Sequence, residues 1–189
     1  TSSTSVYAQG EGQAVDEGMP ADGGTDRAAV LLAAERLVLG GAAEWRRRFV
    51  LRLAGIYGPG RMHLVEQVKS GEIAGRGEHH LNLVHRDDIV GAIAACSRAS
   101  GGRGGVFNVV DDAPTRRAEV AAWLAERLGV VLPRFTGEPH PGRRTVTPDR
   151  RILNGRLRRE LGWRPAFPSF REGTGGPERP RPARAPWVP

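Results

Sequence analysis

The sequence predicts an α/β fold with a largely parallel sheet. Two β-prone runs end at turn residues: 49–54 stops before a Gly-Pro-Gly turn, and 105–110 before Asp-Asp-Ala-Pro. Helix-forming composition and apolar residues at helical spacing predict helices at 25–40, 86–98 and 115–128. Because strands and helices alternate along the chain, we expect parallel strands with helices packed against them.

Local signals mark the ends of these elements. The first helix is expected to start at Thr25 and Asp26, which provide capping chemistry. Asp87 and Asp88 stand in the first turn of the second helix, where carboxylates complement the helix dipole. A shorter helix is expected after Asn154, a candidate cap. Two strands alone would expose too much edge, so they are expected to belong to a larger sheet.

The composition is that of one globular domain. The chain has 189 residues, 39% of them hydrophobic, and contains no apolar run of 18 residues. Its first residues lack the basic and apolar regions of a secretion signal, so we expect a cytoplasmic protein with no membrane partner. The single cysteine, Cys96, lies in an apolar run and is expected to be buried and inert.

The net charge of +7 raises a nucleic-acid partner as an alternative. However, arginine replaces lysine almost completely, with Lys69 the only lysine, and the arginines are spread along the chain. Aromatic residues make up 6% and are too scattered to form base-stacking platforms. Biased composition explains the charge equally well, and nucleic-acid binding remains a weaker alternative.

The carboxyl-terminal residues differ in composition from the rest of the chain. From residue 174 onward, proline and arginine leave too little apolar surface to fold. We therefore expect a domain over residues 1–173 and a disordered tail over residues 174–189.

Five motifs occur in an order that resembles one family, the extended or atypical short-chain dehydrogenases/reductases of the NAD(P)-dependent epimerase/dehydratase type. The resemblance implies a doubly wound Rossmann-type sheet that binds NAD or NADP, with a small carboxyl-terminal region over a small-molecule substrate. A homodimer is a further expectation. The motifs are TSSTSVY at 1–7, LRLAGIYGPGR at 51–61, NLVHRDDIVGAI at 82–93, GGVFNVVDD at 104–112 and LRRELGWRP at 157–165.

The resemblance covers only the carboxyl-terminal portion of such a protein. In the family a glycine-rich turn near the amino terminus holds the cofactor pyrophosphate, and no glycine-rich stretch here follows a strand and opens a helix. We therefore expect a partial sheet that lacks its amino-terminal half. The chain by itself is expected to bind no cofactor and to be inactive.

The same resemblance implies the site residues. Ser3 matches the family's hydroxyl that holds the reacting oxygen, although it could equally cap a turn. Tyr57 could reach the active site as a second catalytic residue, but packing at a strand end is the favoured role. Ala54, Gly55 and Ile56 stand in the loop that faces the cofactor in the family.

The sequence departs from the family's pattern at important positions. Arg27 and Leu31 stand where the family has its Tyr and Lys proton-transfer pair, and neither can replace its counterpart. Leu81 stands where many nucleotide-sugar enzymes of the family carry a phosphate-binding arginine, which disfavours such a substrate. The departures fit an atypical member that binds a dinucleotide without the usual proton relay, or one that uses another acid or base. A non-enzymatic scaffold remnant or regulatory fragment without cofactor is the alternative.

Histidines invite a metal hypothesis that their spacing does not support. His79, His80 and His85 match no closed ligand set, and no cysteine lies near them, so no metal site is expected. His85 and Asp88 resemble the family's helix-start motif. An architectural role is favoured for them, with the carboxylate capping free amides.

Overall fold

The computed structural model describes residues 1–41, 47–101, 104–138 and 148–175. Its central sheet has three parallel strands, in the order β1 (Ser2–Ser3), β3 (Arg48–Leu53) and β8 (Gly104–Val109). The registers Ser3↔Leu53 and Leu53↔Val109 align their carboxyl ends. The predicted α/β class with parallel strands is confirmed.

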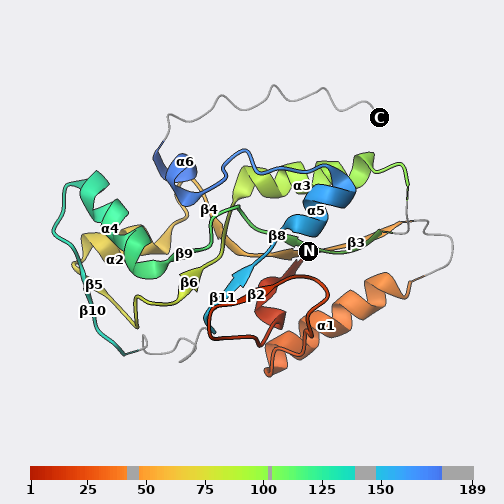
Figure 1. The fold of residues 1–189 in the computed structure, drawn as a ribbon, viewed down its shortest axis with the longest axis horizontal. Coiled ribbons are helices and arrows are strands. Elements are labelled where there is room, and N and C mark those ends of the chain that lie inside the picture. Colours follow the sequence, from red (N-terminus) through yellow and green to blue (C-terminus); the bar gives the residue numbers. More distant parts are fainter. Residues whose placement is uncertain (42–46, 102–103, 139–147, 176–189) are drawn as a thin grey trace.

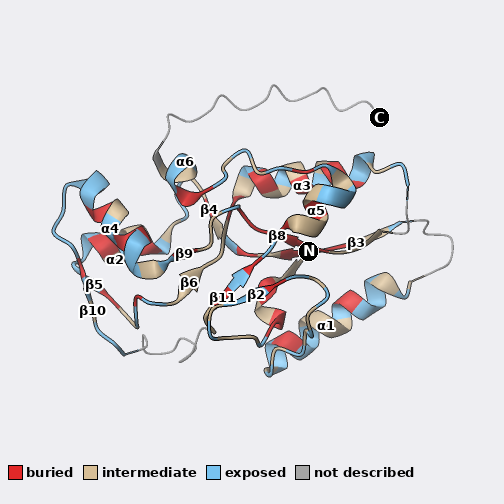
Figure 2. Cartoon of the chain, in the orientation of Figure 1, coloured by how far each residue is buried: buried red, intermediate tan, exposed pale blue. Residues whose placement is uncertain are grey.

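Helices cover both faces of this sheet. Figure 1 shows α1 (Asp26–Leu39) on one face, with α3 (Arg86–Arg98) and α5 (Gly155–Leu161) on the other. The apolar cluster between these layers includes Val109, Ala92 and the buried Cys96. Burial on both faces of the central strands, visible in Figure 2, explains their continuous apolar runs.

A second group of short elements packs around its own apolar cluster, which includes Tyr57, Val68 and Phe170. Two of its strand pairs are parallel and one is antiparallel. Its helices are α2 (His63–Lys69), α4 (Arg117–Leu128) and α6 (Phe170–Gly175). The strand pairs are β4 (Gly55–Tyr57) with β7 (Leu83–His85), β5 (Glu72–Ile73) with β10 (Arg134–Phe135), and β6 (His80–Leu81) with β9 (Thr115–Arg116).

Three further short elements complete the described fold. The short helix η1 (Thr4–Val6) follows β1 directly, and β2 (Gln13–Val15) pairs in parallel with β11 (Arg150–Ile152). Within the described residues, no helix is long and apolar enough to cross a bilayer.

The predicted elements lie within two residues of the observed ones. The helix expected at 115–128 begins two residues later, because Thr115 and Arg116 form β9. Asn154 stands at the cap of α5 as expected, but its side chain makes no capping hydrogen bond and instead donates to the carbonyl of Val110. α6 extends through Gly175, into the segment expected to be disordered; residues 176–189 lie outside the described part.

Candidate functional site

Two of the predicted site residues, Ser3 and Ala54, lie at neighbouring strand ends on the carboxyl edge of the central sheet. Thr4 directly follows β1, and its hydroxyl donates to the carbonyl of Leu53 at 3.4 Å. Ala54 directly follows β3, and its amide donates to the carbonyl of Val109 at 3.1 Å. In open α/β sheets, ligands bind beyond this edge.

Ser3 lies at this edge and caps a turn. Its hydroxyl oxygen accepts a hydrogen bond from the amide of Ser5 at 3.2 Å, which makes it the cap of η1. The residue is half-buried, and its hydroxyl proton remains to donate to another group. The capping role is therefore present, and a substrate role remains a prediction.

Ala54 links β3 to β4, and Gly55 and Ile56 are the first two residues of β4. The Gly55 amide donates to the carbonyl of Asn82 at 2.9 Å, and a side chain at Gly55 would crowd that carbonyl. Ala54 is buried in the main apolar cluster, so a cofactor-facing role for these residues remains a prediction. Residues 58–62 join β4 to α2 and contain two glycines, Gly58 and Gly60, so a short glycine-containing stretch does follow a strand and precede a helix, contrary to the expectation from the sequence. This turn lacks the G-x-x-G-x-x-G spacing of the family's pyrophosphate-binding turn.

Tyr57 is packed inside the second cluster. It is 1% exposed, its hydroxyl donates to the carbonyl of Ser169 at 3.0 Å, and its ring meets the His85 ring edge-on at 5.3 Å. Burial, together with the carboxylates of Asp111 and Asp88, raises its pKa. These contacts favour the packing role, because proton transfer would first require the hydroxyl to leave Ser169.

His85 and Asp88 start α3 as the sequence indicated. The imidazole Nδ1 of His85 accepts from the Asp87 amide at 3.2 Å. The buried Asp88 carboxylate accepts from the amides of Ala166 and Phe167 at 2.6 and 3.2 Å. His85 thus caps the start of α3, and Asp88 holds residues 166–167 against it. Both roles are architectural.

The positions of the missing proton-transfer pair lie on α1. Arg27 is exposed in its first turn, and Leu31 is partly buried against the main apolar cluster. Among the described residues, no group of three or more candidate ligands could hold a metal ion.

Sequence reasoning missed a buried polar network behind the edge. The Arg52 guanidinium pairs with the Glu35 carboxylate at 2.7 Å and donates to the Tyr7 hydroxyl at 2.8 Å. That hydroxyl donates in turn to Asn108 Oδ1 at 2.9 Å. The available signal was an arginine inside the apolar strand FVLRLAG, since a buried arginine needs a carboxylate partner.

The carboxyl group of Asp111 was also missed. It is 2% exposed, one oxygen accepts from the Ala113 amide at 3.1 Å, and the other has no hydrogen-bond partner among the described residues. Burial raises its pKa to about 8, with smaller contributions from the carboxylates of Asp112 and Asp88. In the sequence it resembled an ordinary turn aspartate.

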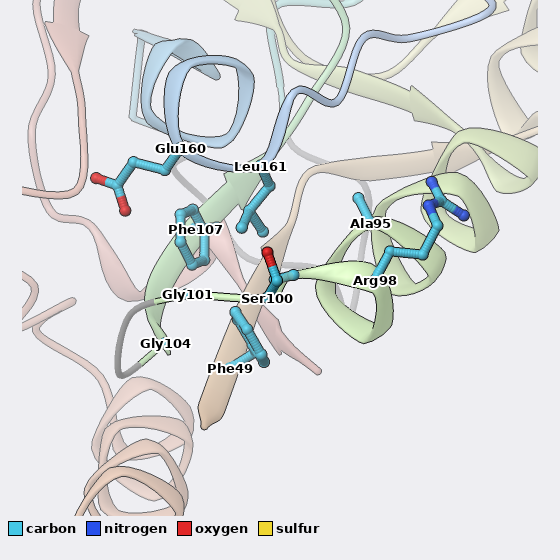
Figure 3. Close-up of a pocket in the computed structure, with 10 residues that line it drawn as sticks. Phe49, Ala95, Arg98, Ser100, Gly101, Gly104, Phe107, Glu160 and Leu161 are labelled. Carbon is cyan, nitrogen blue, oxygen red and sulfur yellow. The ribbon is translucent and has the colours of Figure 1, made fainter. Parts of the chain in front are cut away.

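A cavity of about 450 Å³ lies away from this edge. Figure 3 shows Phe49 and Phe107 beside it, and both come from the central strands. Gly104, the first residue of β8, also lines it, so the cavity lies toward the amino ends of the strands. Parallel α/β sheets bind ligands at the opposite end, and the cavity contains none of the predicted site residues.

The chain resembles proteins that act with nicotinamide cofactors. No protein-family model matches it. The Escherichia coli protein YeeZ is 33% identical over 174 residues, which cover 89% of this chain and 57% of YeeZ. A 3-diazoavenalumate denitrifying reductase of Streptomyces is 31% identical over 155 residues, covering 75% of this chain and 49% of the reductase.

Solved structures agree with these relatives. A Methylobacillus flagellatus protein described as an NAD-dependent epimerase/dehydratase superposes with a TM-score of 0.70 at 28% identity, over 92% of this chain and 60% of that one. The chain resembles the carboxyl-terminal portion of the NAD-dependent epimerase/dehydratase type of short-chain dehydrogenases/reductases. MoeE5, bound to UDP-glucose and NAD, has the same fold, with a TM-score of 0.75 at 23% identity over 91% of this chain and 60% of MoeE5. The chain spans about half to three fifths of the length of these relatives.

Proposed function

We propose that this chain forms the substrate side of an NAD(P)-dependent oxidoreductase or epimerase that acts on a small molecule. The observation that carries the proposal is the shared carboxyl edge of β1, β3 and β8. At this edge Ser3, the last residue of β1, pairs with Leu53 of β3, and Ala54 follows Leu53 directly. The names of the relatives, a reductase and an NAD-dependent epimerase/dehydratase, support the same reaction class.

The cofactor would be NAD or NADP, which exchanges a hydride with substrate carbon. Ala54 and Gly55 would lie beside its nicotinamide end, as the resemblance implies for this segment. The pyrophosphate needs backbone amides at a glycine-rich turn, which residues outside this sequence would have to supply. For that reason we expect weak cofactor binding and no activity from this chain alone.

Ser3 would orient the substrate oxygen. Its hydroxyl can donate to a carbonyl while its lone pairs still accept from the Ser5 amide. In a protein lengthened at the amino terminus to include the glycine-rich turn, we expect Ser3→Ala to lower turnover of a carbonyl substrate about 10- to 100-fold. Ser3→Thr, which keeps the hydroxyl, should retain most of it. Equal turnover by wild type and Ser3→Ala would leave Ser3 with the capping role alone.

A scaffold that has lost its reaction is the second candidate. It is favoured by Arg27 and Leu31, which occupy the positions of the family's proton-transfer pair. A lengthened protein that binds NADPH yet reduces no aldehyde or ketone would support this second candidate.

A further inference from the structure

His80 and Asp149 form a hydrogen-bonded pair outside the candidate site. The imidazole Nδ1 of His80 lies 2.8 Å from Asp149 Oδ1, and the same oxygen accepts from the His80 backbone amide at 2.8 Å. A carboxylate can only accept, so Nδ1 carries the proton and Nε2 is left as the basic nitrogen. Among the described residues Nε2 has no hydrogen-bond partner, and the side chain is 18% exposed.

Hydrogen bonds fix both the side chain and the backbone of Asp149. Partial burial would raise the pKa of Asp149, but the hydrogen bonds from the His80 amide and imidazole outweigh burial and lower it. The Asp149 carbonyl accepts from the Gly12 amide at 2.8 Å. Gly12 follows Glu11, whose φ of 55° is unfavourable for a residue with a side chain. Such strained backbone clusters at functional sites.

Hydrogen bonds connect the pair to the carboxyl edge of the central sheet. Arg150, next to Asp149, donates to the carbonyl of Thr4 at 3.1 Å, one residue beyond Ser3. The Arg150 carbonyl accepts from the Asn82 side chain at 2.9 Å, and the Asn82 carbonyl accepts from the Gly55 amide. Figure 1 shows the same closeness, with β6, β11 and β2 lying together. The His80 pair is therefore connected through Arg150 to both Ser3 and Gly55, in three steps each.

We propose that the His80–Asp149 pair is the proton-transfer site of this protein, a role that rests on the proposed function. In the oxidation direction, Nε2 of His80 takes the proton of a substrate hydroxyl as the O–H bond breaks. The carbon–oxygen double bond forms while the hydride leaves that carbon for the oxidised nicotinamide. Asp149 stabilises the imidazolium that results. In the reduction direction the imidazolium returns the proton to the new alkoxide.

Neighbouring histidines do not share these properties. The adjacent His79 has a pKa lowered by burial and by the charge of Arg117. His85 faces Tyr57 and Phe167 within the second cluster. In the described part of the chain, only His80 of these three has one ring nitrogen hydrogen-bonded to a carboxylate and a second ring nitrogen without a hydrogen-bond partner. Its position fits a protein in which Arg27 and Leu31 cannot move a proton.

The test compares His80→Gln, Asp149→Asn and the control His63→Gln in the amino-terminally lengthened protein. His63 is an exposed residue on α2. We expect NADPH binding, measured by calorimetry, to be unchanged in all three. Turnover of an aldehyde and ketone panel should fall 100-fold or more in His80→Gln, in the usual range for loss of a general base, and the pH profile should lose one limb. His63→Gln should match wild type.

A second measurement on the present chain separates proton transfer from a structural role. ¹⁵N NMR should show His80 protonated at Nδ1, and diethyl pyrocarbonate should modify its Nε2. Asp149→Asn, which preserves shape, should shift the tautomer and slow the modification several-fold. Intact cofactor binding with turnover and a pH profile unchanged in His80→Gln would overturn this inference alone. A wild-type lengthened protein that binds neither NADH nor NADPH, or that binds one of them without any turnover, would overturn the proposed function and the inference with it.

Discussion

Arg52 is the residue whose environment most constrains the central sheet. It lies on β3, 6% exposed, with its charge balanced by Glu35 on α1. The pair thereby joins helix to strand directly behind the strand ends that carry the site.

Arg52→Met should destabilise the protein by about 3–5 kcal/mol, because Glu35 would be left buried without a counter-charge. Urea unfolding of the single and double substitutions would measure the coupling. The double substitution Arg52→Met with Glu35→Leu should recover much of the loss. If the single and double variants unfolded at the same urea concentration, the ion pair would not be coupled as the structure shows.

Asp111 should make stability depend on pH. Its folded-state pKa is about 8 whereas an unfolded aspartate titrates near 3.8, so the folded state holds a proton that the unfolded state has lost. Stability should therefore fall as pH rises from about 4 to about 8, by up to about 1.4 kcal/mol per unit. Asp111→Asn should flatten this dependence in urea unfolding series. A wild-type slope that persists in Asp111→Asn would assign the effect to other groups.

At the scale of single residues, the sequence predicted the positions of candidate site residues better than their contacts. Ser3, Ala54 and Gly55 lie at the strand ends where the family resemblance implied, since motif order fixes chain position. The Arg52 network and the His80–Asp149 pair depend on contacts across 17 and 69 residues of chain. Local pattern carries no information about such distant partners.

The short helix α6 is the element most directly tied to the second cluster. Phe170 is fully buried, and Trp123 of α4 meets its ring edge-on at 5.3 Å. Gly173 packs so closely against Tyr57 that an added Cβ would overlap the phenol ring and hydroxyl.

Gly173→Ala should therefore displace α6 and cost about 1–3 kcal/mol of stability, in the range of overpacked sites. Gly101→Ala is the matched control, because nothing lies within 4 Å of an added Cβ there. Thermal unfolding would compare the melting temperatures of the two variants. Equal melting temperatures would show that α6 does not pack against Tyr57 as described.

Elements with strong local signals were predictable, and those formed by tertiary pairing were not. The apolar pattern of 86–98 gave the bounds of α3 because its buried face repeats at helical spacing. Strands such as β6 and β11 have two or three residues and are defined by their partners. Asn154 illustrates the limit, since its position was predictable but its bond to Val110 was not.

At the scale of the molecule, the sheet and its covering helices reproduce the family's architecture over most of this chain. The order of the five motifs predicted this architecture, because the same order in the family implies the same arrangement in space. The small second cluster was anticipated only as a substrate-covering region, since its strands are too short to show a period.

Calorimetric titration of NADH and NADPH tests the central claim most directly. The present chain should show no binding at micromolar concentration, because dinucleotide affinity depends on amides of a glycine-rich turn. The same chain, lengthened at its amino terminus by upstream sequence carrying that turn, should bind one of the two cofactors at micromolar concentration. Micromolar binding by the present chain, or none by the lengthened protein, would contradict the account.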